Sequence, residues 1–383
     1  MRVLHVHSGN IYGGVETLLT TLARNRDFCP QMQSHFALCF DGRLEEELIA
    51  AEMPVYRLGS ARISRPWTLL SVRRALRELL RRERFDVVVC HSAWTLAIFG
   101  PVVRAARVPL VFWLHATSDG RHWLERWAKG TTPDLVLCNS RFTASKKSLL
   151  FPQVRGELIY CPVTLPERRY TRTELYETRD ELRTPQEAVV IIQISRLEPY
   201  KGHSVLLEAL GLLSDLSDWV YWQVGEAKRP FEVDYLRRLK AAAIRLGIQE
   251  RVRFLGWQPD AHRLLAAADI YCQPNTWAEP FGITFVEALF AGLPVVTTAM
   301  GGPKEIVDES CGVLVPPDDP KALANSLRSL IEDTKLRASF GDAGPGRARE
   351  LCDPETQIRK LYQLLAAITN EHPKETPQRI GTA

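Results

Sequence analysis

The sequence predicts an α/β protein with two domains, each built on a parallel sheet that helices cover on both faces. Short apolar segments that suit buried strands alternate with longer helical segments along most of the chain, an order that is typical of parallel pairing. The length of 383 residues exceeds what one ordinary domain needs and fits two, each with its own core. Between the halves, residues 167–187 are charged, rich in threonine and without strong periodicity, which indicates a linker.

Composition and charge exclude several classes of protein. With 45% hydrophobic and 25% charged residues, the chain resembles soluble globular proteins, and no stretch approaches the ~18 uncharged apolar residues of a transmembrane helix. The N-terminus enters a strand directly and lacks the pattern of a signal peptide. The eight cysteines include no C-x-x-C pair, so we expect reduced, buried thiols in the cytoplasm and no metal site. The net charge of +4 gives no support for nucleic-acid binding.

The N-terminal half begins with a buried strand over 3–7, which a loop containing Gly13 and Gly14 connects to a helix over 15–24. This order places backbone amides at a helix start, where an anion can approach closely. A Gly-Gly turn is nevertheless more often a tight connection than a phosphate site. The other strands of this half are expected at 35–40, 55–58, 86–90, 110–115, 135–138 and 159–166.

His115 stands at the carboxyl end of the strand expected at 110–115. Ligands bind at the carboxyl ends of the strands in parallel sheets, so His115 is a candidate site residue. Judged by position alone, a purely structural histidine is the commoner alternative.

The helix expected over 62–84 carries eight arginines against two glutamates, together with an apolar stripe that includes Trp67. Such a helix can lie on an anionic membrane surface, and the amphipathic segment 121–129 adds to this interpretation. The alternative is an ordinary packed helix with a solvated basic face.

The C-terminal half opens with an apolar, β-branched strand over 188–194, followed by a turn with Arg196 and Lys201 and a helix over 203–213. Arginine can bind two phosphate oxygens at once and lysine adds a compact charge, so the two could neutralise a departing diphosphate without a metal. The alternative is a pair of solvated surface charges. Further strands are expected at 219–224, 252–255, 270–273 and 312–315, and helices at 320–332 and 354–368.

Two carboxylates, Glu279 and Glu287, lie eight positions apart on either side of a Pro-Phe-Gly break. The break predicts a helix that starts near Ile283 or Thr284, with Glu279 on the preceding loop and Glu287 in the early helix. Unpaired amides at the helix start favour negative charge, and a carboxylate can accept hydrogen bonds from vicinal hydroxyls such as those of a ribose. The bare spacing occurs by chance, and a solvated helix face is the alternative.

The full string from Glu279 to Glu287, with the Gly-Leu-Pro-Val-Val run at 292–296, resembles the Glu-x7-Glu signature of retaining glycosyltransferases of family 4. The Arg-Leu-x-Pro-x-Lys-Gly sequence at 196–202 resembles the diphosphate-binding loop of the same family. The resemblance spans essentially the whole chain and implies the GT-B fold, in which two Rossmann-like domains face each other across a cleft.

The resemblance, together with the composition of the linker and of the polar, proline-containing tail, indicates where the domains begin and end. The expected parts are an acceptor-binding domain over 1–166, the linker over 167–187, a nucleotide-sugar-binding domain over 188–352, a helix over 353–369 that packs back on the first domain, and a disordered tail over 370–383.

Carried over residue by residue, the resemblance implies catalytic roles for four residues. Arg196 and Lys201 would stabilise the leaving diphosphate, and His115 would contact the transferred sugar. Glu279 would hold that sugar near C3 and C4, while Glu287 would hold the ribose hydroxyls. The implied donor-binding set is Gly13, Gly14, Arg196, Lys201, Gly225, Gly256, Trp257, Glu279, Phe281, Gly282, Ile283, Thr284 and Glu287.

The implied reaction transfers a sugar from a nucleoside diphosphate sugar to a hydroxyl of a carbohydrate or lipid-linked acceptor, with retention of configuration and without cofactor or metal. UDP-sugars are the favoured donors and GDP-mannose the alternative, and the expected pathway is polysaccharide, lipopolysaccharide or glycolipid biosynthesis. We expect a cytoplasmic enzyme with peripheral contact to an anionic membrane. Two alternatives stay open, a nucleotide-sugar epimerase with the same fold and a non-catalytic nucleotide-sugar-binding protein.

Overall fold

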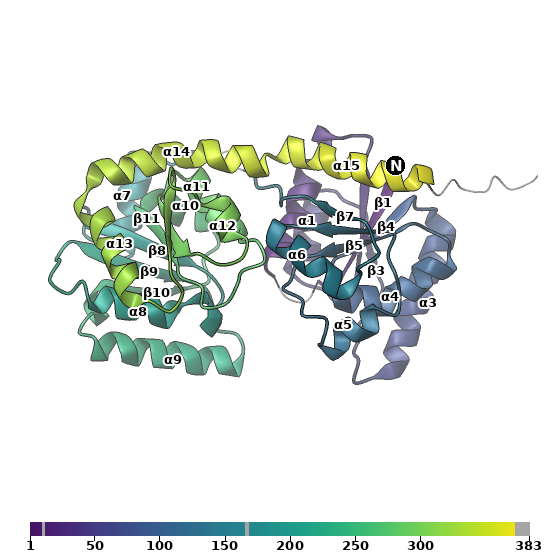
Figure 1. Ribbon diagram of the computed structural model, residues 1–383, viewed down its shortest axis with the longest axis horizontal. Coiled ribbons are helices and arrows are strands. Elements are labelled where there is room, and N and C mark those ends of the chain that lie inside the picture. Colours follow the sequence, from purple (N-terminus) through teal and green to yellow (C-terminus); the bar gives the residue numbers. More distant parts are fainter. Residues whose placement is uncertain (10–11, 165–167, 372–383) are drawn as a thin grey trace, which may run out of the picture. The chain divides into compact units, whose positions relative to one another are not determined.

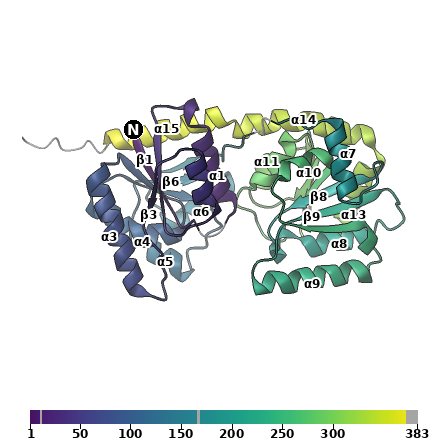
Figure 2. The same cartoon turned by 180° about the vertical axis from the view of Figure 1, so that it is seen from behind.

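The computed structural model describes residues 1–9, 12–164 and 168–371, which form two compact units, each a parallel sheet between layers of helices (Figure 1, Figure 2). Unit 1 comprises Met1–Pro162 together with the chain from Pro354, and unit 2 comprises Val163–Asp353. The predicted α/β architecture with two parallel sheets is confirmed. Of the tail expected to be disordered, all but the first two positions lie outside the described residues.

Within the described residues, unit 1 contains a 7-stranded sheet in the order β3-β2-β1-β4-β5-β6-β7, with every neighbouring pair parallel. The strands are β1 (Arg2–His7), β2 (Gln33–Leu38), β3 (Val55–Arg57), β4 (Val87–Cys90), β5 (Leu110–Leu114), β6 (Leu135–Cys138) and β7 (Gly156–Leu158). The helices are α1 (Gly14–Arg24), α2 (Arg43–Ala50), α3 (Pro66–Glu83), α4 (Ala93–Ala105), α5 (Trp123–Ala128), α6 (Arg141–Leu150) and α15 (Pro354–Glu371).

The central strands of unit 1 are apolar along their whole length because helices cover both faces of the sheet. Every residue of β4 and β5 is buried, and α3 adds Leu76 and Leu79 to the core. The strand order reverses between β1 and β4, because the chain first builds outward to β3 and then returns to the other side of β1. The carboxyl ends of β1 and β4 therefore border the crevice in which open α/β sheets bind ligands.

Unit 2 contains, within the described residues, a 6-stranded parallel sheet in the order β10-β9-β8-β11-β12-β13. The strands are β8 (Val189–Ile194), β9 (Trp219–Val224), β10 (Val252–Gly256), β11 (Ile270–Gln273), β12 (Val295–Thr298) and β13 (Gly312–Val315). The helices are α7 (Arg172–Glu181), α8 (His203–Gly211), α9 (Pro230–Arg245), α10 (Ala261–Ala267), α11 (Ile283–Phe290), α12 (Pro303–Ile306), α13 (Pro320–Glu332) and α14 (Thr334–Cys352). Here the order reverses between β8 and β11, so the loops after these strands border the crevice of unit 2.

The last strand of unit 1 differs from the prediction. The strand expected at 159–166 is wrong, since β7 ends at Leu158, before that range begins. Positions 165 and 166 of the range lie outside the described residues. Ile159 makes one more ladder hydrogen bond, to the carbonyl oxygen of Cys138 at 2.8 Å. Pro162 has no N–H with which to continue the ladder.

The segment expected to be a linker over 167–187 contains a helix. In α7 the hydroxyl of Thr171 and the carboxylate of Glu174 form a reciprocal capping box, which sets the helix start. The helix packs against α10, and Arg179 donates to the carboxylate of Asp269 at 2.8 Å. These contacts make α7 part of unit 2.

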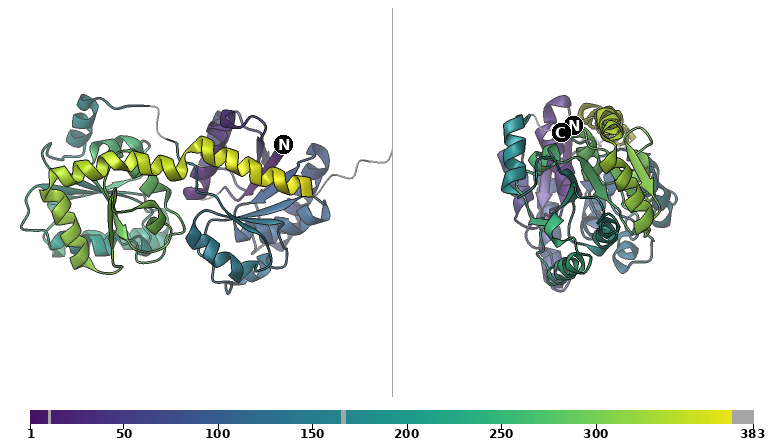
Figure 3. Two further views of the ribbon diagram at one scale, coloured as in Figure 1. Left: turned by 45° about the horizontal axis from the view of Figure 1, so that its top comes forward. Right: turned by 90° about the vertical axis from the view of Figure 1, so that its left-hand side faces the viewer.

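The C-terminal helix α15 groups with unit 1 and lies along it in Figure 3. Leu361 and Leu365 are fully buried on one face of α15, which contacts the short 3-10 helix η1 (Arg26–Phe28). Among the described residues, no helix is long and apolar enough to cross a membrane.

Candidate functional site

The loop after β8 holds Lys201 in a fixed place just before α8. Gln193, which is fully buried, donates from Nε2 to the carbonyl oxygen of Lys201 at 2.8 Å and accepts from the Tyr221 hydroxyl at 2.9 Å. Gly202 then turns the chain into α8 with a φ of 77°, and a Cβ there would lie 1.7 Å from the carbonyl oxygen of Pro274. Because only glycine fits, the loop after β8 can lie directly against the loop after β11.

Lys201 and Glu279 come from these two loops and form an ion pair. Lys201 Nζ lies 2.5 Å from Glu279 Oε2, and each side chain is only 13% exposed. The backbone of Glu279 is bridged to Gly301, where a Cβ would lie 2.2 Å from the Glu279 carbonyl oxygen. The same oxygen accepts from the N–H of Gly302 at 2.8 Å. The predicted catalytic lysine and the first predicted carboxylate are thus brought together at the crevice of unit 2.

Arg196 lies on the same loop as Lys201 and contacts a neighbouring carboxylate. Its Nη2 is 3.1 Å from Oε2 of Glu198, while Arg229 from the start of α9 binds the other oxygen at 2.9 Å. The Arg196 side chain is 44% exposed and that of Glu198 only 13%. Glu198 therefore anchors an arginine whose charge stays accessible to a ligand.

Helix α11 starts at Ile283, as predicted, and carries Glu287 in its second turn. Gly282 leads into the helix with a φ of 98°, and no side chain of the described residues caps the helix start, so its first amides are available to a ligand. Glu287 is partly buried, and burial raises the pKa of its carboxyl. The ring of Phe281 belongs to the core, which leaves only its backbone to face a ligand.

Gly225 and Gly256, which were also predicted in the donor site, lie where the ends of β8, β9 and β10 contact one another. Gly225 follows β9 with a φ of 151°, and a Cβ there would lie 2.0 Å from the carbonyl oxygen of Ser195. Its N–H donates to the carbonyl oxygen of Gly256 at 2.8 Å. Trp257, directly after Gly256, leaves 52% of its surface exposed beside this junction.

In unit 1, His115 is joined to other histidines that the sequence did not single out. His115 Nε2 lies 3.1 Å from Nδ1 of His91, which follows β4, and His91 Nε2 lies 2.9 Å from Nδ1 of His5 on β1. Burial is the main cause that lowers the pKa of His5 and His115 to about 3 and that of His91 well below its usual value. Nearby, His7 Nε2 lies 2.5 Å from Oε1 of Glu16 on α1.

Gly13 and Gly14 lie at the start of α1, as predicted. Gly13 is extended, and the nearest atom that a Cβ would meet is Oε2 of Glu16 at an ordinary 3.6 Å. Neither backbone conformation nor space therefore demands glycine at position 13. Residues 10 and 11 of this loop lie outside the described part of the chain.

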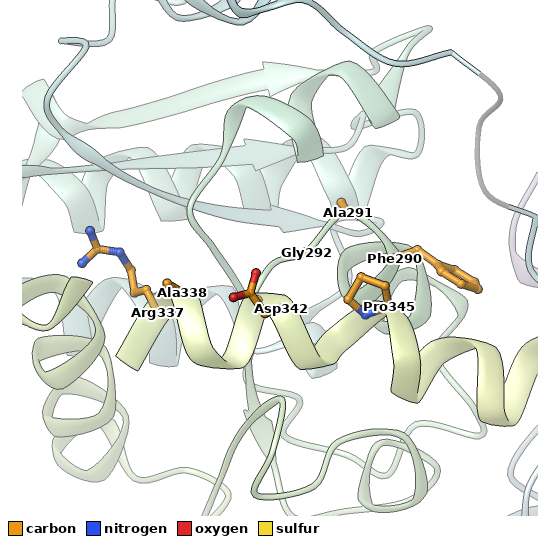
Figure 4. A pocket seen from close by; sticks show the side chains of 8 residues that line it. Phe290, Ala291, Gly292, Arg337, Ala338, Asp342 and Pro345 are labelled. Atoms are coloured by element: carbon orange, nitrogen blue, oxygen red, sulfur yellow. The ribbon is translucent and has the colours of Figure 1, made fainter. Parts of the chain in front are cut away.

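A hollow of about 340 Å³ in unit 2 lies apart from these residues, between the C-terminal end of α11 and α14 (Figure 4). Its lining consists of Phe290, Ala291, Gly292, Arg337, Ala338, Gly341, Asp342 and Pro345. It contains none of the predicted site residues and lies at the opposite end of α11 from Glu279. In the described part of the chain, no three His, Cys, Asp or Glu side chains are placed to hold a metal ion.

Two family models match the chain. The model described as Glycosyltransferase Family 4 matches residues 12–165, and the model described as Glycosyl transferases group 1 matches residues 176–347. The two matches follow the division into units, since one falls in unit 1 and the other in unit 2 apart from a few residues near their junction.

Relatives and solved structures agree with these matches. The phosphatidyl-myo-inositol mannosyltransferase of Mycobacterium leprae is 36% identical over 175 residues, which is 44% of this chain and 44% of that relative's length. The alpha-1,3/1,6-mannosyltransferase of Homo sapiens is 28% identical over 321 residues, or 76% of this chain and 75% of that protein. The Anabaena HepE structure in complex with UDP and glucose has a TM-score of 0.84 and 26% identity, covering 96% of this chain and 100% of that chain.

The family resemblance and the fold expected from the sequence are both confirmed. The motif residues at 196–202 and 279–287 lie within the matched range, and the two parallel sheets are those of GT-B glycosyltransferase structures. The chain therefore belongs to glycosyltransferase family 4 and has the GT-B fold.

Proposed function

We propose that the protein is a retaining glycosyltransferase that transfers a sugar from a nucleoside diphosphate sugar to a hydroxyl group of an acceptor. The observation that carries this proposal is the Lys201–Glu279 pair at the crevice of unit 2, with Arg196 on the same loop. Two cations and a carboxylate match both ends of such a donor, which has an anionic diphosphate and a sugar with several hydroxyls.

The bond that breaks in this reaction joins the anomeric carbon to a diphosphate oxygen. Lys201 and Arg196 stabilise the negative charge that develops on that oxygen, which lowers the barrier because the charge grows in the transition state. Glu279 accepts hydrogen bonds from sugar hydroxyls and orients the ring. The leaving phosphate takes the proton of the acceptor hydroxyl while the new bond forms on the same face, so configuration is retained without a covalent nucleophile, a cofactor or a metal.

The donor is assigned as a UDP-sugar, with GDP-mannose as the competing donor. Support for uridine comes from the HepE structure, which contains UDP and glucose and matches 96% of this chain. Support for GDP-mannose comes from the mannosyltransferases among the relatives. In either case Glu287, in the second turn of α11, binds the ribose hydroxyls, and the exposed Trp257 offers an aromatic ring on which the base can stack.

The acceptor is assigned as a glycolipid or lipopolysaccharide precursor at an anionic membrane, on which the protein lies peripherally from the cytoplasmic side. Trp67 and Leu70 on the first turns of α3 are 67% and 68% exposed and lie one helical turn apart. Exposed arginines surround them, namely Arg62, Arg65, Arg74 and Arg77. Apolar anchors among cations are the combination that binds anionic lipid surfaces. Two relatives are named for phosphatidyl-myo-inositol and for the lipopolysaccharide core, which fits such an acceptor.

The experiment that tests the proposal is a thermal-shift panel with UDP-glucose, UDP-GlcNAc, UDP-galactose, UDP-glucuronate, GDP-mannose and ADP-glucose. A ligand that binds only the native state raises the apparent stability, so one nucleotide class should raise Tm. The shift should disappear in Glu287→Gln and persist in the control Glu309→Gln, an exposed acid of the same unit. No shift with any donor would contradict the proposal, and release of an epimerised sugar with free nucleotide would replace it by the epimerase alternative.

A further inference from the structure

Three histidines of unit 1 form a continuous hydrogen-bonded chain that runs from His5 on β1 to His91, directly after β4, and His115, directly after β5. The nitrogen–nitrogen distances are 2.9 Å between His5 and His91 and 3.1 Å between His91 and His115. The ring centroids are 5.2 Å and 5.4 Å apart. Nitrogens this close at such centroid distances lie on the line between the ring centres, so the rings meet edge to edge. This is the geometry that an N–H···N hydrogen bond requires.

All three imidazoles are neutral at pH 7, because burial holds the pKa of each far below that pH. A neutral imidazole has one N–H donor and one bare nitrogen. The protonation of one ring therefore fixes that of the next, and the chain has only two consistent arrangements. In one, every Nδ1 carries the proton and the hydrogen bonds run from His5 toward His115. In the other, every Nε2 carries it and the direction is reversed.

The buried end of the chain distinguishes the two arrangements. His5 is fully buried, and its Nε2 has no hydrogen-bond partner among the described residues. The reversed arrangement would place an N–H on this nitrogen, and a buried donor without an acceptor is rare in folded proteins. The forward arrangement leaves only a bare lone pair there. At the other end, His115 is partly exposed, so its Nδ1 can be satisfied by water or a ligand.

We propose that His5 and His91 are positioning residues that hold His115 as its Nδ1–H tautomer, so that Nδ1, the ring nitrogen of His115 that His91 does not contact, donates a hydrogen bond to an oxygen of a ligand at the crevice of unit 1. This inference rests on the proposed function for the identity of that ligand as a substrate of sugar transfer. His115 then discriminates by chemistry, since it complements an acceptor oxygen of a sugar hydroxyl or a phosphate. His7 stays outside the chain, because its Nε2 is engaged by Glu16 and its ring meets His91 edge-on at 6.3 Å between centroids.

The decisive experiment records long-range ¹H–¹⁵N correlations on the full-length, ligand-free protein labelled with ¹⁵N-histidine, at pH 7. The chain has nine histidines, and single substitutions assign them. We expect His5, His91 and His115 each to be neutral and protonated at Nδ1. A proton on Nε2 in any of the three, or an imidazolium, would overturn the proposal. This readout does not depend on catalysis.

Variants connect the tautomer to turnover. His91→Phe keeps an aromatic ring at this position but removes both hydrogen bonds of the imidazole. His115 should then gain the Nε2–H tautomer, and kcat should fall about tenfold. His91→Gln, whose amide can both donate and accept, should restore part of the rate. The matched control is His35→Phe. His35 is a buried histidine on β2 that is hydrogen-bonded to Tyr56 and not to the three histidines, so its replacement should change neither the His115 tautomer nor kcat.

Two further outcomes separate this inference from the proposed function. A rate loss in His91→Phe with an unchanged His115 tautomer would overturn the positioning role. A wild-type protein with the expected tautomers that transfers sugar from no donor would refute the proposed function while leaving the tautomer assignment supported.

Discussion

Replacing Lys201 by methionine tests the ion pair at the crevice of unit 2, because the substitution removes the charge and keeps most of the apolar stem. The partner atoms are 2.5 Å apart and both side chains are 13% exposed, so Glu279 would be left as a nearly buried, unpaired carboxylate. Removing one partner of a buried pair costs about 3–5 kcal/mol, and the residual exposure lowers our expectation to about 2–3 kcal/mol of unfolding free energy. The double variant Lys201→Met/Glu279→Gln should recover most of this loss, because no buried charge remains unpaired.

Urea denaturation of the wild type, both single variants and the double variant at pH 7 measures the coupling, which we expect to be about 2 kcal/mol. The control is Lys228→Met, which removes an ion pair at the surface: the Lys228 side chain is 73% exposed and that of its partner Glu226 is 45% exposed. This substitution should lower the free energy of unfolding by less than about 0.5 kcal/mol. Turnover of Lys201→Met should fall about a hundredfold, equivalent to about 2.7 kcal/mol of transition-state stabilisation. Additive stability changes, or turnover close to that of the wild type, would refute the reasoning.

Three other predictions follow from single features of the structure. Gly202→Ala should destabilise the protein by more than about 2 kcal/mol in urea denaturation, since its Cβ would lie 1.7 Å from a backbone oxygen, whereas Gly247→Ala, with similar φ but open space, should cost only about 1 kcal/mol. Burial raises the pKa of Glu287 in the native state above its ordinary 4.5. The free energy of unfolding of the wild type, measured relative to Glu287→Gln, should therefore fall as pH rises from 4.5 through the native pKa and then level off. A difference in unfolding free energy that stays constant between pH 4 and 8 would contradict this. Trp67→Ser/Leu70→Ser should weaken sedimentation with anionic vesicles at least tenfold by removing the apolar anchors, and equal binding by the variant would exclude α3 as the contact.

Much of the fold could be predicted from local pattern. The strands expected at 219–224, 270–273 and 312–315 coincide with β9, β11 and β13, because each is a short run of mostly apolar residues in a fully covered sheet. The break before Ile283 likewise predicted the start of α11 correctly. Local sequence is sufficient in such places because the local preference and the tertiary environment agree.

Helix α14 shows where local pattern fails. Its sequence contains Gly341, Gly344 and Pro345, which are poor helix formers, and it was not predicted. The structure supplies the reason, since a Cβ at Gly341 would lie 2.4 Å from the carbonyl oxygen of Gly292 at the end of α11. The glycines allow close approach of the two helices, so tertiary packing overrides the intrinsic preference.

The candidate site was predicted as a set of residues but not as a set of contacts. Arg196, Lys201, Glu279 and Glu287 follow from motifs, yet the pairing of Lys201 with Glu279 joins positions 78 apart that no local pattern connects. His5 and His91, the partners of the predicted His115, were missed for the same reason. The available signal was a histidine within the apolar strand β1 and another directly after β4. It becomes informative only once the strand order is known to reverse between these two strands.

Transfer with retention can be measured without knowing the acceptor, because water can replace it in slow donor hydrolysis. Time-resolved ¹H NMR of the wild type with the α-linked donor that stabilises it should detect the α-anomer of the free sugar first, before mutarotation. The signal should be lost in Lys201→Met, because this variant lacks the cation that stabilises the negative charge on the leaving diphosphate. Initial formation of the β-anomer would contradict retention, and hydrolysis at the wild-type rate in Lys201→Met would contradict the role assigned to the Lys201–Glu279 pair.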